Sequence, residues 1–270
     1  MMNWVSDIAL EIAYGMVDDI ERYAILAIGV WLALWVILRD VLRNRKIRGD
    51  WPPARQLVME FAHSIRSIAI YSVVGLLISY LWRWGLVPWA DVNRSMDDPY
   101  WFWGSVLAMI VVHDAYFYWA HKLVHHPKRF RLYHRRHHLS MNPSPFTAYS
   151  FDIREAAIMV MFVLLWTLLV PHAPGSIAMF VVVSLVKNTL GHSGFELMPA
   201  TREGKPMFDW LTTTVHHDLH HRRAGYNFGL YFTWWDRWMG TEDPIYHAEF
   251  KRVIDQGREI EPESAEPAAA

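Results

Sequence analysis

The stretch WFWGSVLAMIVVHDAYFYWAHKLVHH, residues 101–126, joins a long apolar block directly to a pair of spaced histidines. Residues 101–120 are predominantly apolar, and a helix that crosses a membrane needs about 20 such residues. His121 and His125 follow at positions i and i+4, which lie on one face of a helix. The stretch therefore predicts a membrane span that ends in two potential metal ligands.

Three further apolar blocks suggest additional spans. Residues 23–38 and 67–81 form two of them, and the longer block 156–190 is interrupted by Pro171, Pro174 and Gly175. That break predicts a helical hairpin, which either crosses the bilayer or only dips into it. Aromatic residues at block ends are typical of a membrane interface. Those residues are Trp82, Trp84, Trp89, Tyr100, Trp101 and Trp103. We therefore predict an all-α integral membrane protein with about four transmembrane helices. A soluble helical core, whose buried helices can also be apolar all round, is the alternative.

Charge predicts the orientation of these spans. The loops 39–66 and 122–136 are basic, whereas the loop 87–100 is acidic on balance through Asp91, Asp97 and Asp98. Because lysine and arginine mark cytoplasmic loops, we expect a multi-pass protein with both basic loops in the cytoplasm. The chain also returns to that side after residue 190, so a cytoplasmic helical cap would carry the histidines. Topology and anionic head groups explain the basic loops, so no nucleic-acid partner is predicted.

The histidines fall into clusters with the spacing of metal ligands. Of the 15 in the chain, eight form three clusters. They are His121 and His125, then His134, His137 and His138, then His217, His220 and His221. Read on helices, each cluster points its imidazoles to one face. One structural zinc is satisfied by about four ligands, so eight imidazoles predict two metal ions. Imidazole suits zinc, copper, iron and nickel, which leaves the metal open.

Other residues near the clusters are candidates for supporting roles. His192 emerges at the cytoplasmic boundary and is a possible ninth ligand. Asp114 lies seven residues before His121, about two helical turns, where its carboxylate could orient that imidazole. Asp218 is expected to pair with a basic residue such as Arg222 or Arg223. The pattern assigns no role to three further histidines, which are His113, His126 and His216.

The residue types narrow the chemistry. The absence of cysteine excludes disulfides, thiolate metal sites, iron–sulfur clusters and thiol catalysis in this chain. Neutral imidazoles without a nearby nucleophile do not suit acyl transfer. Two ferrous ions could instead use oxygen to remove hydrogen from an unactivated carbon. At a membrane surface, the substrate would be a lipid that enters sideways between the helices.

The order of the histidine clusters resembles that of the fatty acid hydroxylase and sterol desaturase superfamily. HKLVH, HRRHH and HHDLHH occur in that order, with Asp114 before the first box and GHSG between the second and third. The segment GYNFGLYFTWWDRWMGTE, residues 225–242, is similar to the superfamily's carboxy-terminal signature. The resemblance implies a membrane-bound non-haem di-iron enzyme that uses O2 and external electrons to hydroxylate or desaturate a sterol-like or fatty acyl lipid. Two iron ions would be its cofactors, with zinc as a possible substitute.

The resemblance also implies roles for individual residues. The metal ligands carry over to the eight clustered histidines together with His192. Where some fatty acyl hydroxylases of the family have a further histidine, this chain has Glu196, which could ligate or bridge metal instead. The chain has no haem-binding or ferredoxin-like segment, which implies a separate electron-donor protein of the ferredoxin, cytochrome b5 or reductase type.

The chain is predicted to divide into three regions. Residues 1–100 form an N-terminal membrane region, residues 101–245 the catalytic domain, and residues 246–270 a tail expected to be disordered, because the part after Gln256 is polar and proline-containing. Two other functions fit parts of the pattern. A metal transporter would use the histidines for cargo, but usually near the bilayer midplane. A metal-dependent hydrolase would use His-Asp pairs, but such centres usually mix several carboxylates with histidine.

Overall fold

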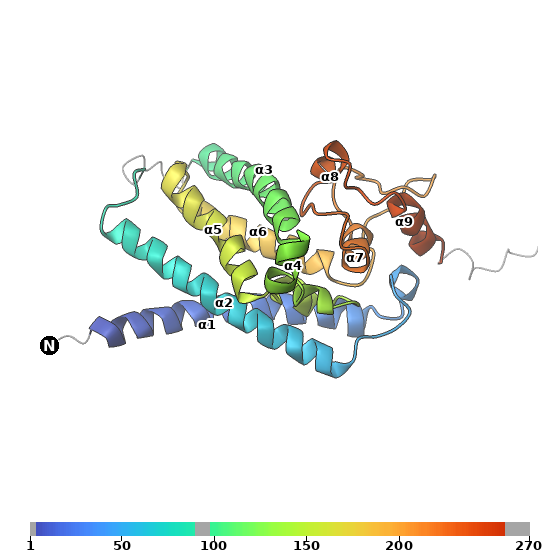
Figure 1. Ribbon diagram of the computed structural model, residues 1–270, viewed down its shortest axis with the longest axis horizontal. Coiled ribbons are helices and arrows are strands. Elements are labelled where there is room, and N and C mark those ends of the chain that lie inside the picture. The colour runs from blue at the N-terminus through green and yellow to red at the C-terminus, as the bar shows by residue number, and fades with distance from the viewer. Residues whose placement is uncertain (1–3, 90–97, 257–270) are drawn as a thin grey trace, which may run out of the picture.

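The computed structural model describes residues 4–89 and 98–256, which are helical apart from their connecting loops (Figure 1). The elements in chain order are α1 (Trp4–Trp31), the π-helix η1 (Leu32–Ile37), η2 (Arg43–Arg45), α2 (Ala54–Arg83), α3 (Pro99–Val124), α4 (Pro127–Tyr133), η3 (His137–Leu139), η4 (Pro145–Tyr149), α5 (Ile153–Leu169), α6 (Ser176–Gly191), α7 (Thr214–Arg222), α8 (Trp234–Trp238) and α9 (Tyr246–Asp255). The described residues contain isolated β-bridges and no β-strand. The prediction of an all-α protein is therefore confirmed.

The first two apolar blocks lie within long helices that pack against each other (Figure 1). Among the described residues, two helices are long and apolar enough to cross a membrane, Leu10–Ile37 and Ala54–Arg83. Both leave large apolar side chains exposed, including Ile25 and Val73. Exposed apolar surface of this extent indicates association with a membrane. Both helices begin well before the apolar blocks, because the polar residues that precede each block are compatible with a helix.

The third block forms α3 and runs into the first histidine pair, as predicted. The side chain of Asp98 caps the helix by accepting hydrogen bonds from the backbone N–H groups of Tyr100 and Trp101, each at 3.1 Å. Pro99 occupies the first turn, where no N–H partner is needed. His121 lies in the last turn of α3, and His125 is its C-cap.

The fourth block forms the predicted hairpin of α5 and α6. The break lies where the sequence placed it, and Gly175 takes a left-handed conformation with φ of 75° just before α6. The two helices have 17 and 16 residues, shorter than the about 20 of an upright span. Both pack on α3 through a core of Met109, Phe162, Trp166 and Phe180.

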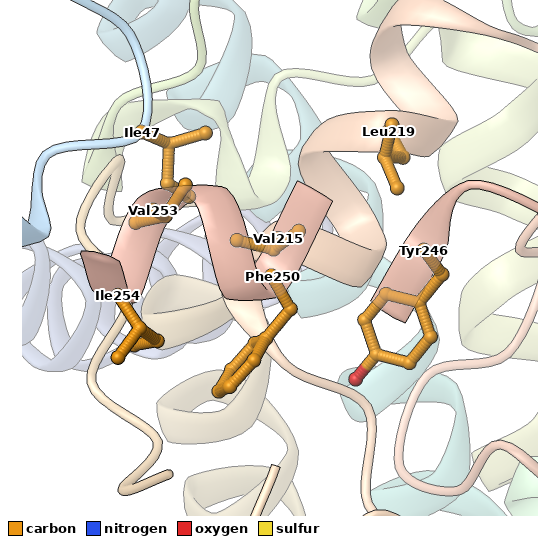
Figure 2. Packing of buried hydrophobic residues seen from close by; sticks show 7 residues of the cluster. All are labelled: Ile47, Val215, Leu219, Tyr246, Phe250, Val253 and Ile254. Carbon is orange, nitrogen blue, oxygen red and sulfur yellow. The ribbon is translucent and has the colours of Figure 1, made fainter. Parts of the chain in front are cut away.

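The carboxy-terminal part of the chain corrects the predicted boundary at residue 246. Residues 246–255 form helix α9, and its side chains Tyr246, Phe250, Val253 and Ile254 are buried against α7 and Ile47 (Figure 2). Their spacing gives one apolar helix face, which the surrounding charged residues mask in a simple composition profile. The rest of the predicted tail, residues 257–270, lies outside the described residues, as do Asp91 and Asp97 of the acidic loop.

The first two helices pack directly against the part of the chain that carries the histidine clusters. Tyr23 and Ala27 of α1 and Ile68 of α2 form one buried cluster with Phe146 of η4 and Leu185 of α6. The hydroxyl group of Tyr23 also donates a hydrogen bond of 3.0 Å to the carbonyl of Phe146. The first two helices thus support the segment that follows the second histidine cluster.

Candidate metal centre

The nine predicted metal-ligating histidines lie together in two groups. The first group contains five imidazoles from the end of α3, the turn around η3 and α7. These are His121, His125, His134, His138 and His220, whose ligand atoms all lie within 4.8 Å of one another. Within this group, the Nε2 atoms of His121 and His134 are 3.0 Å apart, and His138 Nε2 is 3.1 Å from His220 Nε2.

The second group contains four imidazoles, from η3, the C-cap of α6 and α7. These are His137, His192, His217 and His221, again with ligand atoms within 4.8 Å of one another. The Nε2 atom of His192 lies 2.9 Å from His217 Nε2 and 3.3 Å from His137 Nε2. His192, the one predicted ligand that lies outside the sequence clusters, is therefore at the middle of this group.

The two groups do not coincide with the three sequence clusters. On α7, His217 and His221 belong to the second group, whereas His220 belongs to the first. His137 likewise faces the second group, while its neighbours His134 and His138 face the first. The prediction that each cluster shares one face is therefore wrong for two of the three. The physical reason is that α4 ends at Tyr133, so the second cluster lies in a turn and a 3-10 segment, while α7 lies between the groups.

Backbone carbonyl groups fix the orientation of several of these rings. A carbonyl oxygen only accepts, so the Nδ1–H of each ring must be the donor. The acceptors are the carbonyl oxygens of Phe228 for His121 at 2.9 Å, of Asn188 for His192 at 2.8 Å, and of Tyr226 for His220 at 2.6 Å. In the neutral ring, each Nε2 then presents a lone pair to the group. Such partners hold metal-ligating histidines in one tautomer and one orientation.

Electrostatics keep the imidazoles neutral and make the site suited to a cation. Burial and the neighbouring imidazoles lower the pKa of His138 to about 3 and hold the pKa values of His217, His220 and His221 well below the usual range. The neutral rings have too few protons to place one between every pair of facing Nε2 atoms. Nitrogen lone pairs therefore face each other at about hydrogen-bond distance. The buried ring nitrogens of His221 also have no hydrogen-bond partner among the described residues. Nitrogen lone pairs that converge in this way fit metal ions.

Asp114 does not orient His121, which corrects that prediction. Its carboxylate accepts hydrogen bonds from the backbone N–H groups of Tyr231 and Phe232, at 2.9 and 3.3 Å, and from Trp234 Nε1 at 2.6 Å. Seven residues correspond to about 10 Å along a helix axis, which is too far for a short carboxylate to reach the imidazole. Asp114 instead fastens the segment 231–234 to α3.

Glu196 lies outside both histidine groups. Its two carboxylate oxygens accept from the backbone N–H groups of Met198 and Val215, each at 2.8 Å. Burial raises the pKa of this carboxyl group, while those backbone hydrogen bonds act in the opposite direction. The prediction of a metal-ligating or bridging carboxylate is therefore replaced by a positioning contact, which ties the start of α7 to the loop after α6.

The sequence reasoning missed Glu155. This glutamate is buried in the first turn of α5, and its Oε1 atom lies 2.5 Å from Nδ1 of His134. The sequence does contain a signal for Glu155. An ionisable residue beside an apolar segment is costly to bury, and such residues usually have a function. Glu155 lies far in sequence from the nearest histidine cluster, so no local pattern indicated its contact with His134.

The remaining candidates have contacts of their own. The ring of His113 is buried, with Nδ1 3.0 Å from the hydroxyl oxygen of Tyr231. His126 caps α4, and His216 is buried beside Asp236 with 3.8 Å between His216 Nε2 and Asp236 Oδ2. Asp218 pairs with Arg222 at 3.0 Å, as predicted, and also with Arg48 at 2.7 Å.

An apolar cavity of about 470 Å³ adjoins both histidine groups. It lies between α2, α3, α5 and α6 and is lined by residues that include Phe117, Phe151, Val163 and Leu185. The ring of Phe117 lies 5.1 Å from that of His121, and the ring of Phe151 lies 5.2 Å from that of His137. Two side chains of the cavity wall thus each contact one imidazole, His121 of the first group and His137 of the second.

Gly229 lies in the loop that carries the Tyr226 and Phe228 carbonyl groups, and it provides a test of that loop. A Cβ atom added at Gly229 would lie 2.6 Å from the carbonyl oxygen of Phe232 and 2.9 Å from Asp236 Oδ2. We expect Gly229→Ala to destabilise the protein by about 1–3 kcal/mol, the usual cost of overpacking, and to lower activity about tenfold by displacing the carbonyl group that holds His121.

Thermal unfolding and turnover of the purified protein would measure both effects of Gly229→Ala. Gly225→Ala is the matched control, because no atom lies within 4 Å of its added Cβ. Equal behaviour of the two variants would contradict the role given to this loop.

The chain is similar in sequence to known proteins. The fatty acid hydroxylase family model matches residues 106–241. A cholesterol 25-hydroxylase of Rattus norvegicus is 28% identical over 78% of this chain and 68% of its own length. A very-long-chain aldehyde decarbonylase of Arabidopsis thaliana is 29% identical over 60% of this chain and 28% of its own length.

A third relative, a delta(7)-sterol 5(6)-desaturase of Gibberella zeae, is 26% identical over 57% of this chain. The match covers 49% of that desaturase, so the chain spans less than half the length of two of these three relatives. No solved structure matches the chain.

Proposed function

The chain belongs to the fatty acid hydroxylase family, and from that membership we propose that it is a membrane-bound, non-haem di-iron oxidoreductase that uses O2 to hydroxylate or desaturate a lipid. The observation that carries the proposal is the pair of histidine groups, with five and four members, in contact with wall residues of an apolar cavity. Metal ligands and a lipid-sized apolar space therefore occur at the same place in the fold.

The histidines of the first group would hold one ion and those of the second group the other. When bound, two iron ions supply the redox chemistry, because together they can deliver electrons to O2 and generate an oxidant able to remove hydrogen from carbon. The residues of the chain bind and orient around that chemistry. Glu155 and the Phe228, Tyr226 and Asn188 carbonyl groups hold the imidazoles in place. Zinc could replace iron in such a set of imidazoles.

The substrate is a sterol-like or fatty acyl lipid. The cavity is lined mainly by aliphatic and aromatic side chains from helices α2, α3, α5 and α6, and such a lining suits an apolar molecule. Phe117 and Phe151 would place a carbon of that lipid near both histidine groups. A lipid that fills this space would also exclude water from the reacting carbon.

The chain crosses the membrane about four times, with the active site on the cytoplasmic face. Helices α1 and α2 have the length and hydropathy of spans, and α3 and the hairpin of α5 and α6, which are less apolar or shorter, would supply the other crossings. The positive-inside rule supports this orientation, because basic residues surround the histidine groups.

Electrons reach the site from a separate donor protein. Lys128, Arg129, Arg131 and Arg135 are exposed on and beside α4, next to His134 and His138. A basic surface so close to the histidines would dock an acidic ferredoxin, cytochrome b5 or reductase.

Untargeted lipid mass spectrometry tests the function directly. Cells that express the chain or its His137→Ala variant would be grown under isotopically labelled oxygen. A lipid that gains one labelled oxygen only with the intact chain identifies a hydroxylase, and a lipid that loses two hydrogens without label identifies a desaturase. Identical lipids in both cultures, with electron donors supplied, would contradict an oxygenase. Metal uptake by vesicles that also depends on His137 would favour a transporter instead.

A further inference from the structure

A second pocket of about 490 Å³ lies where the first apolar helix ends. Its walls come from the loop after η1, from Phe195 after α6 and from the end of α9 at Arg252 and Gln256. The loop and α9 are joined by a shared core in which Ile47 packs with Val253 (Figure 2). The pocket is therefore a built feature of the fold, separate from the apolar cavity.

The pocket carries an excess of positive charge. Five of its lining residues are cationic, and Asp40 is the only acidic one. The cationic residues are Arg39, Arg43, Lys46, Arg48 and Arg252. Arg48 pairs with Asp218 at 2.7 Å and Arg252 with Glu249 at 2.9 Å. Within the described part of the chain, the other three cations form no ion pair.

Two of these cations have donor groups without an acceptor. The side chain of Lys46 is buried, and its Nζ donates one hydrogen bond of 3.1 Å, to the carbonyl of Asp50. The rings of Trp51 and Trp35 lie 4.9 and 5.0 Å from this ammonium group. The Nη2 atom of Arg48 is buried and finds no partner among the described residues. Buried cationic donors of this kind are costly unless an anion satisfies them.

The position of the pocket indicates where such an anion comes from. The candidate span Leu10–Ile37 ends two residues before Arg39. Ile37 and Val41 expose 75% and 76% of their surface beside the basic residues, so this segment is apolar toward the membrane and cationic toward the pocket. That combination is the chemistry of the interface between acyl chains and head groups.

We propose that this pocket binds the phosphate group of an anionic phospholipid. Arginine and lysine recognise phosphate through several charge-assisted hydrogen bonds at once, and the exposed residues Arg39 and Arg43, which form no ion pair in the described part of the chain, line the pocket beside Lys46. Free phosphate presents the same group to these residues. The lipid-binding site is independent of the proposed oxygenase activity.

Lipid retention by the full chain tests this site. In detergent micelles, native mass spectrometry would compare the affinities for phosphatidic acid and phosphatidylcholine. Arg43→Gln combined with Lys46→Met removes two pocket cations. We expect this variant to bind phosphatidic acid about tenfold or more weakly, the loss of at least one charge-assisted hydrogen bond. Phosphatidylcholine binding should remain weak and unchanged.

The matched control is Arg55→Gln combined with Arg202→Gln, which removes two exposed cations outside the pocket. We expect its affinity to stay within about twofold. An equal loss in both variants, or no preference of the intact chain for phosphatidic acid, would overturn the proposal. If inorganic phosphate binds and phosphatidic acid does not, the lipid assignment is overturned. Should Lys46→Met unfold the protein, Arg39→Gln with Arg43→Gln changes exposed side chains of the same pocket and provides the same comparison.

Discussion

Replacing His217 and His221 by alanine should leave the chain with about one bound iron ion in place of about two and lower product formation by more than about 100-fold. The two side chains supply half of the second histidine group, while His220 between them belongs to the first. The first group therefore keeps all five of its imidazoles. Loss of a directly ligating residue should exceed the 10- to 100-fold effect that is typical of the partners that orient ligands.

The measurement is iron content by elemental analysis beside labelled-oxygen incorporation into lipid. His121→Ala with His125→Ala is the counterpart, since it removes two members of the first group and leaves the second intact. His126→Ala is the control, because this exposed histidine caps α4 and belongs to neither group. Loss of both ions from the His217 and His221 variant, with the control intact, would show that the two groups do not bind metal separately.

The division of α7 between two groups could not be predicted from spacing alone. An i, i+3, i+4 pattern places side chains within one half of a helix surface, and His217, His220 and His221 satisfy that pattern. A helix that lies between two sites can still direct its edges to different sites. Which edge faces which site depends on the arrangement of α3, α6 and η3 around it, and that arrangement is tertiary information.

The helical class and the residues of the site were predictable for a different reason. Apolar blocks and histidine spacing are local properties, and they identified α3, the α5–α6 hairpin and eight of the nine members of the two groups. The ninth, His192, was a candidate because of its position after the hairpin and the family resemblance. The predicted roles of Asp114 and Glu196 were wrong because the hydrogen-bond partners of these carboxylates are distant in sequence. Asp114 bonds to residues 231–234, and Glu196 to the start of α7. No local pattern specifies contacts of that range.

Glu155→Gln should lower both iron affinity and turnover by about 10- to 100-fold. The Glu155 carboxylate lies 2.5 Å from His134 Nδ1, and both side chains are 1% exposed. A carboxylate that accepts from Nδ1–H makes the other ring nitrogen a stronger donor to metal. Glutamine has the shape of glutamate, and its amide oxygen can still accept a hydrogen bond from Nδ1–H of His134, but its side chain carries no charge.

Asp152→Asn is the matched control for the loss of charge. Asp152 precedes the same helix and pairs with Arg136 at 3.5 Å, and it belongs to neither histidine group. We expect this variant to keep its iron and most of its turnover, because partly exposed ion pairs contribute little. An iron titration that gives the same affinity for Glu155→Gln and the intact chain would mean that the Glu155 carboxylate only fills space beside His134. A selective loss would instead establish that a residue outside the histidine boxes sets the strength of the metal site.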